Sequence, residues 1–500
     1  MEKRDQRMRS RGLMAMIVTA IVLLVGGQAT ADKTLQDDWY GMELAGIQVG
    51  WSHSLVTVKG DELHSQMDME MSLKRGLSEV SLAMNTTWVE TVAGKPVSVA
   101  LSQDMSMMKN VASWTFTPEG IKIVETSGGQ PVTRLVPLPE EKWLTPYAAF
   151  QYFIKRVEAG DKKIEVVTMS PEVGPKPVKM VYTWLGEEKI TIKGKEIPTT
   201  MWNQVNEAMP TISSKNWISS DGVLVASETN IGVGMMTMTL TNRAEAKQEP
   251  GEVPEVFYEL LIEPNMEITD PWKARRVVLR VKTKDGEPIE LPSTGCQSIA
   301  GVRDGVVTVV VDCDSPQPAT SEELADPAIL GQSVMIDPKD SRVISVHESA
   351  MKDVPATATT MERAEALRAY VYEYIDAKDL GTAFASASEV ARTRTGDCSE
   401  HGVLLAALLR VDGIPSRVVT GLVYVPGLRE RGVFGWHMWT QGLIDGNWVD
   451  LDATLPVTYS GGHVTTGTST LEEGSGAADM AAIVTWINNV DIEVVSVEHE

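Results

Sequence analysis

Apolar and polar residues alternate along most of the chain between residues 37 and 245. In one example, Met67, Met69 and Met71 are separated by acidic residues. A period of two is typical of half-buried antiparallel strands, because successive side chains of a strand point to opposite faces of the sheet. The pattern breaks at residues 147–157, where we expect one helix packed on the sheet. This part of the chain is therefore predicted to be β-rich.

A second group of strands is predicted further along the chain. Residues 246–255 mix charged residues with Pro and Gly, which is typical of a linker. Residues 274–291 then alternate around an Asp-Gly turn, and residues 305–313 resemble a further strand. These patterns predict a small β domain over residues 252–320. Residues 315–358 are rich in Pro, Ser, Asp and Thr, so we expect an irregular segment with at most short helices.

The spacing of apolar residues becomes helical after Thr359. Thr359 and Glu362 have the spacing of a capping box, in which the side chain of each residue accepts a hydrogen bond from the backbone N–H of the other. A second helix is predicted to begin after Asp397, which can act as its N-cap, with Glu400 three residues further on. Gly413 is expected to end this helix. The C-terminal half of the chain is thus predicted to contain at least two amphipathic helices.

Two strands are predicted at residues 435–444 and 447–454. They are joined by Asp445 and Gly446. An Asp-Gly pair between two alternating apolar runs is the strongest short-range indication of a β-hairpin with a two-residue loop.

The hairpin register selects one acidic partner for His437. With a two-residue loop, His437 faces Thr454 and lies diagonal to Asp452 on the same face of the sheet, within side-chain reach. Asp450 pairs instead with Gln441, about 13 Å from His437 along the strand. A loop one residue longer would place His437 and both aspartates on opposite faces.

Composition and the N-terminus limit the classes of function. The chain has 45 Lys and Arg against 68 Asp and Glu, a formal charge of −23, which disfavours nucleic acid and anionic membranes. A basic start, an apolar run at residues 13–25 and the small residues of Ala29, Thr30 and Ala31 predict a signal peptide that is cleaved after Ala31. The alternative is an uncleaved anchor, although the run is shorter than the ~20 residues that span a bilayer. We expect a periplasmic or secreted protein without a membrane span after cleavage.

The three cysteines are Cys296, Cys313 and Cys398. In an oxidising compartment Cys296 and Cys313, which are close in sequence, are predicted to form a disulfide. Cys398 is then a free thiol and a candidate nucleophile. It follows the Asp397 cap, so the N–H groups and the dipole of the helix favour its thiolate. The alternative is an inert buried cysteine.

Cys398, His437 and Asp452 are therefore the candidate catalytic residues. A thiolate requires an imidazole beside it, and the imidazole requires a carboxylate that orients it and stabilises its charged form. His401, on the same helix as Cys398, is a less favoured base. No cofactor or metal is predicted: there is no calcium-loop spacing, and the methionines of the strands fit adaptable core packing better than copper binding. The sequence around the other histidines distinguishes none of them: His53, His64, His347, His463 and His499.

The segments at residues 386–422 and 435–454 closely resemble the core of the transglutaminase-like superfamily. The matching positions are a Gly-x-Cys that ends at Cys398, an aromatic residue before His437, and an Asp-x-Thr that begins at Asp452. The resemblance implies that Cys398 attacks the carbonyl of a protein or peptide substrate to give a thioester. Water would then complete hydrolysis, which we favour, whereas an amine would give cross-linking. In a non-enzymatic alternative the triad is vestigial and the β region serves in envelope binding or assembly.

The sequence thus predicts a multidomain chain with N-terminal all-β regions and an α+β, papain-like or transglutaminase-like core. The length suits about three domains. The oligomeric state is left open. The expected boundaries are a signal peptide at 1–31, a β-rich domain at 32–245, a small β domain at 252–320, a catalytic core at 345–460 and an extension packed on the core at 461–500.

Overall fold

A computed structural model of the 500-residue chain describes residues 32–499 with internal gaps. The gaps are residues 76–77, 106–107, 128–130, 172–173, 250, 252–253, 255–259, 287, 378–383, 458 and 472–488. The predicted signal peptide and part of the predicted linker at 246–255 lie outside the described residues. Among the described residues, no helix is both long enough and apolar enough to cross a membrane.

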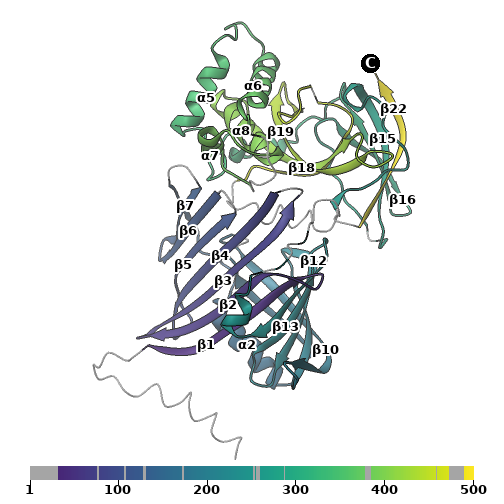
Figure 1. Ribbon diagram of the computed structural model, residues 1–500. Coiled ribbons are helices and arrows are strands. Elements are labelled where there is room, and N and C mark those ends of the chain that lie inside the picture. Colours follow the sequence, from purple (N-terminus) through teal and green to yellow (C-terminus); the bar gives the residue numbers. More distant parts are fainter. Residues whose placement is uncertain are drawn as a thin grey trace, which may run out of the picture.

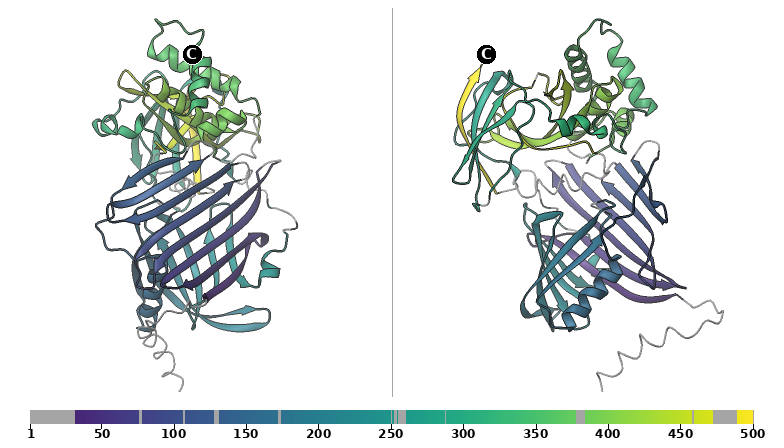
Figure 2. Two further views of the ribbon diagram at one scale, coloured as in Figure 1. Left: turned by 90° about the vertical axis from the view of Figure 1, so that its left-hand side faces the viewer. Right: turned by 180° about the vertical axis from the view of Figure 1, so that it is seen from behind.

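An antiparallel sheet of 14 strands forms the N-terminal half of the molecule, with the order β8-β7-β6-β5-β4-β3-β2-β1-β14-β13-β12-β11-β10-β9. The sheet curls on itself (Figures 1 and 2). Its strands are β1 (Lys33–Leu44), β2 (Ile47–Lys59), β3 (Glu62–Arg75), β4 (Ser78–Thr91), β5 (Pro96–Met105), β6 (Met108–Thr117), β7 (Gly120–Ser127), β8 (Val132–Val136), β9 (Lys163–Met169), β10 (Pro177–Ile192), β11 (Lys195–Asn206), β12 (Met209–Ser219), β13 (Leu224–Asn230) and β14 (Met235–Thr241). The all-β character predicted from alternation is confirmed.

The predicted helix in this region is α2 (Pro146–Glu158). Phe153 of α2 packs with Ile164, Val166 and Trp202 of the sheet in a buried cluster. A short helix, α3 (Arg243–Ala246), follows the last strand. The 14-stranded sheet and its helix therefore have their own apolar clusters, separate from those of the C-terminal half.

A second, four-stranded sheet has the order β16-β17-β15-β22. Its strands are β15 (Ala274–Thr283), which follows the short helix η2 (Pro271–Lys273), β16 (Gln297–Arg303), β17 (Val306–Asp312) and β22 (Val490–His499). The alternation expected across the turn at 285–286 gives a strand only before the turn: the described residues 288–293 form none, and β15 pairs with β17 and β22. The end of the chain thus completes this sheet (Figure 1).

The third sheet has the order β20-β19-β18-β21 and carries the helices of the C-terminal half (Figure 1). Its strands are β18 (Ser416–Val425), β19 (Val433–Ile444), β20 (Asn447–Leu451) and β21 (His463–Ser469). Helix α8 (Cys398–Val411) packs on β18 and β19, and the helices around α8 are α5 (Ser341–Met351), α6 (Thr360–Tyr374) and α7 (Ala387–Thr393). Both predicted helix starts are confirmed, with capping boxes at Thr359 and Asp397.

The segment expected to hold at most short helices contains a longer one. Besides α4 (Ser321–Ala325) and η3 (Pro327–Ile329), it contains the 11-residue helix α5. Asp340 caps α5 by accepting a hydrogen bond from the backbone N–H of Arg342, and Val343 and Val346 are buried. The prediction failed because this helix depends on packing against α6, α7 and α8.

The β19–β20 hairpin has the predicted register. Asp445 and Gly446 both have positive φ angles, of 50° and 80°, as a tight two-residue turn requires. Gln441 pairs with Asp450, which is the pairing expected for a two-residue loop. Along β19, Met438 enters the core beneath the helices, whereas Trp439 enters the core shared with the second sheet. This sheet therefore lies between two apolar layers.

Candidate functional site

Cys398 is the first residue of α8, and its position depends on the cap. The side chain of Asp397 accepts a hydrogen bond from the backbone N–H of Ser399 at 2.9 Å, and Glu400 accepts one from the N–H of Asp397 at 2.9 Å. Burial of Glu400, followed by the nearby charge of Asp397, raises the pKa of Glu400 to about 8. Cys398 is half-buried, with its thiol at the end of the helix where the dipole favours negative charge.

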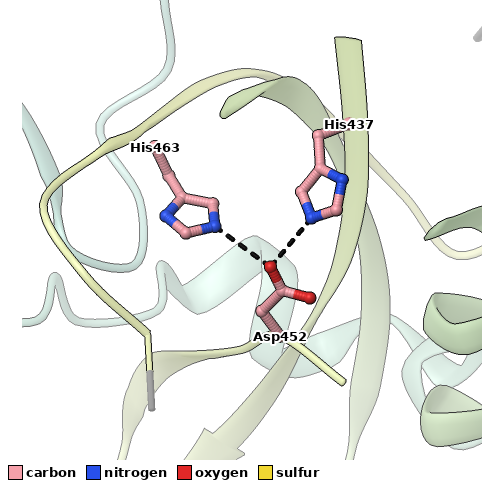
Figure 3. Close-up of side chains that lie close together, drawn as sticks. All are labelled: His437, Asp452 and His463. Carbon is pink, nitrogen blue, oxygen red and sulfur yellow. Dashed lines mark hydrogen bonds and ion pairs between the residues drawn. The ribbon is translucent and has the colours of Figure 1, made fainter. Parts of the chain in front are cut away.

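His437 and Asp452 are in contact, as the register predicted. Nε2 of His437 lies 2.8 Å from Oδ2 of Asp452 (Figure 3). The other oxygen of Asp452, Oδ1, accepts a hydrogen bond from the N–H of Thr454 at 2.8 Å. Cys398 lies close enough to His437 to raise the pKa of the imidazole. Because Nε2 faces Asp452, Nδ1 is the ring nitrogen available to Cys398.

The contacts favour the charged forms of both members of the His437–Asp452 pair. Burial alone would lower the pKa of His437, but Asp452 and Cys398 outweigh it and raise this pKa to about 10. Burial would likewise raise the pKa of Asp452, but His437 and a second histidine, His463, hold it well below its ordinary value of 3.8. These contacts therefore favour an imidazolium at His437, beside the carboxylate of Asp452.

Asp450 has a different role. Its carboxylate is buried and accepts hydrogen bonds from Trp439 Nε1 at 2.8 Å, Gln441 Nε2 at 2.9 Å and the N–H of Cys296 at 2.7 Å. Burial raises its pKa, although these donors oppose the effect. Asp450 thus connects the hairpin to the second sheet, while Asp452 faces His437.

His401, the less favoured base, is fully buried and engaged elsewhere. Its Nδ1 donates a hydrogen bond to the backbone carbonyl of Asp397 at 2.6 Å. This bond to the preceding turn of α8 gives the ring a structural role at the helix start.

His463, one of the histidines that the sequence did not distinguish, also contacts Asp452. It lies on β21, which pairs with β18, and its Nε2 is 3.1 Å from Asp452 Oδ2 (Figure 3). The ligand atoms of His437, Asp452 and His463 lie within 4.8 Å of one another, a spacing that one metal ion could span. The contact was missed because β21 begins 26 residues after His437 and pairs across a third strand.

The predicted disulfide is absent. All three cysteines are free thiols. The neighbouring thiol of Cys313, followed by burial, raises the pKa of Cys296 well above its ordinary value of 9.0, which disfavours its thiolate. The sequence correctly predicted that Cys296 and Cys313 lie close together, but in the structure both are thiols.

The site thus places a cysteine at the start of α8 beside a histidine of β19 and an aspartate that directly follows β20. Residues 349–453 match the family model of the transglutaminase-like superfamily. This segment of the chain is therefore a transglutaminase-like core, which confirms the resemblance seen in the sequence. The match ends before His463. No curated protein matches the chain.

Comparison with solved structures finds matches of low similarity to parts of the chain. A β-barrel-like domain of unknown function from Brucella abortus has 10% identity and a TM-score of 0.32, covering 41% of this chain and 96% of its own. A candidate cysteine protease from Cytophaga hutchinsonii has 17% identity and a TM-score of 0.27, covering 48% and 83%. The periplasmic domain of TgpA from Pseudomonas aeruginosa, bound to ethylmercury, has 15% identity and a TM-score of 0.24, covering 38% and 93%.

Proposed function

We propose that this protein is an exported cysteine enzyme that hydrolyses peptide or amide bonds, with Cys398 as nucleophile, His437 as general acid and base, and Asp452 as its carboxylate partner. The observation that carries the proposal is the 2.8 Å contact of His437 with Asp452, next to a helix-start cysteine, Cys398, that raises the pKa of His437. The three residues of this proposed triad come from the start of a helix and from the two arms of a hairpin.

In the first half of the reaction, the thiolate of Cys398 attacks the carbonyl carbon of the substrate. The C–N bond breaks, and the leaving amine takes a proton from His437. The acyl group remains on sulfur as a thioester. The backbone N–H of Cys398 lies in the first turn of α8, where helix N–H groups lack an intrahelical partner, so it can donate to the oxyanion.

In the second half, water replaces the amine. His437, now neutral, accepts a proton from the water molecule that attacks the thioester carbonyl. The intermediate collapses to a carboxylic acid and the thiolate, which restores the ion pair with His437. Asp452 stays ionised throughout and stabilises the imidazolium each time it forms. An amine in place of water would give transamidation, but hydrolysis requires only solvent.

The first experiment measures the chemistry of Cys398 without a known substrate. Wild type and His437→Ala are alkylated with iodoacetamide near neutral pH, and the peptides that contain each cysteine are followed by mass spectrometry. Cys398 should react about 10-fold or more faster than a thiol of ordinary pKa, and His437→Ala should lose this advantage. Cys313, which is partly exposed, provides the internal comparison. Reaction of Cys398 at the rate of an unactivated thiol would argue for a vestigial site.

The second experiment identifies the reaction. A peptide library is incubated with wild type and with Cys398→Ala, with and without an added primary amine. Cleavage by wild type alone supports hydrolysis. Incorporation of the amine at the expense of cleavage would favour cross-linking, and the absence of both products despite a reactive Cys398 would contradict peptide substrates.

A further inference from the structure

His463 is held in a closed environment beside the site. It is fully buried, and its ring stacks on Tyr459 with centroids 4.2 Å apart, while Trp439 meets it edge-on at 5.2 Å. Nδ1 lies 3.0 Å from the carbonyl oxygen of Ser460, and Nε2 lies 3.1 Å from Oδ2 of Asp452. Figure 3 shows both imidazole rings directed at the same carboxylate.

Both nitrogens of His463 therefore face acceptors. A carbonyl oxygen can only accept, and the carboxylate of Asp452, whose pKa is held well below 3.8, is ionised and can only accept. A neutral imidazole has one N–H and can satisfy only one of these partners. Only a doubly protonated ring could donate to both acceptors at once, and the stacked ring of Tyr459 is a surface on which a cation is favourable.

We propose that His463 is a positioning residue of the site, a buried cation that clamps Asp452 toward His437 and balances its charge. This inference rests on the proposed function of Cys398 and His437. Asp452 is completely buried and receives one N–H from Thr454 on Oδ1 and two ring N–H groups on Oδ2. Three donors hold the carboxylate plane, so the direction of His437 is held too.

The charges of the site then balance. When Cys398 is a thiolate, two anions, Cys398 and Asp452, face two cations, His437 and His463. Without the charge of His463 the buried group would carry a net negative charge, which the low-dielectric interior disfavours. Formation of the thiolate should then require a higher pH. The titratable groups that face His463 are Asp452, His437, Asp450 and Tyr459.

The match to the family model ends at residue 453, so the clamp comes from a strand outside it. β21 reaches the site because it pairs with β18, and Val423 is opposite His463. Gly421 of β18 is paired with His437 of β19 on one side and with Thr465 of β21 on the other. A Cβ at Gly421 would lie 2.6 Å from the Trp439 ring. The absence of a side chain at this position therefore leaves room for Trp439, which packs edge-on against His463.

Two substitutions separate the charge of His463 from its hydrogen bond. His463→Gln keeps an N–H donor toward Asp452 but removes the charge, and His463→Phe keeps the stacking on Tyr459 but removes both. His347→Gln is the matched control, because His347 also contacts an aspartate, Asp412, at 3.1 Å, away from the site. The readout is the pH dependence of Cys398 alkylation by iodoacetamide in the full-length protein, with folding checked by thermal melts.

We expect both variants to shift the acid limb of the alkylation profile upward by about one pH unit, which lowers the rate at about pH 6 roughly 10-fold. Only His463→Phe should also lower the plateau rate, because Asp452 loses a donor. His347→Gln should change the melting temperature alone. Reduced melting temperatures with an unshifted profile in both His463 variants would overturn the proposal.

Two further outcomes keep the inference separate from its alternatives. If wild-type Cys398 reacts as an unactivated thiol, the proposed function fails; if it is activated and both His463 variants keep the wild-type profile, only the clamp fails. Metal content is measured in purified wild type, and alkylation is repeated with EDTA. A stoichiometric metal whose removal reproduces the His463→Phe profile would make the three side chains metal ligands and overturn the clamp. An unchanged profile with EDTA supports it.

Discussion

Replacing Asp452 with Asn tests the electrostatic core of the site. The substitution keeps the shape of the side chain and removes its charge. The amide oxygen of Asn can still accept hydrogen bonds, but it offers no counter-charge to the two imidazole rings that meet at Oδ2, 2.8 and 3.1 Å away. A neutral His437 can then adopt the tautomer that places its N–H toward Cys398, where it cannot accept the thiol proton.

The structure sets the size of the effect. The pKa of His437 is raised from 6.5 to about 10 by Asp452 and Cys398 acting against burial. At 1.36 kcal/mol per pKa unit, that shift corresponds to roughly 5 kcal/mol in favour of the imidazolium. In the Asp452→Asn variant, Cys398 and the Asn amide would still provide part of this stabilisation of the imidazolium. If about half is lost, alkylation of Cys398 at about pH 6 should fall roughly 10²-fold and recover above about pH 9, where any thiol ionises.

Alkylation by iodoacetamide is followed from about pH 5 to 10 on the peptide that contains Cys398. The matched control is Asp450→Asn, a change of the same kind two residues away in the same hairpin. Asp450 is equally buried but binds Trp439, Gln441 and the Cys296 N–H, so its variant should lose stability and keep the wild-type profile. An equal loss of reactivity in both variants, at comparable melting temperatures, would refute the assignment of Asp452.

Three further predictions address the remaining parts of the structure. Because Cys398 and His437 act as a unit, the double Ala variant should cost hardly more hydrolytic activity than Cys398→Ala alone; additive losses in kcat/KM would contradict this. Burial and Asp397 raise the pKa of Glu400 to about 8, so its contribution to stability is complete below pH 4.5 and is lost as the pH rises through about 8. Glu400→Gln should flatten that fall in urea unfolding, and an unchanged slope would show that Glu400 does not titrate in the folded protein. Gly421→Ala should destabilise by about 3 kcal/mol or more in urea unfolding, because its Cβ would lie 2.1 Å from the Val464 carbonyl; a loss within about 1 kcal/mol would mean that β21 moves freely.

The features that could be predicted from the sequence are those with local causes. Thr359 and Asp397 cap their helices with residues only three positions away, so the capping boxes were visible in the sequence. The hairpin was predictable for the same reason. Its register follows from the positive φ angles that Asp445 and Gly446 can adopt, and a two-residue loop leaves one pairing.

The features that the sequence left undetermined depend on which distant segments pair. Residues 285–286 carry the same turn chemistry as the hairpin, yet β15 pairs with β17 and with β22 from the end of the chain. Helix α5 lies in a segment whose composition predicts irregular structure, and it is stabilised by burying Val343 and Val346 against neighbouring helices. Local propensity is weaker than such packing, and it carries no information about remote partners.

At the site, the sequence by itself determined the thiol at a helix start and the alignment of His437 with Asp452. Only the tertiary structure decided what surrounds the carboxylate. His463 reaches Asp452 because β21 pairs across β18, and no spacing in the sequence records that pairing. A two-residue turn fixes the register of the two strands that it connects. The pairing of β21 with β18 depends instead on burying both faces of the sheet.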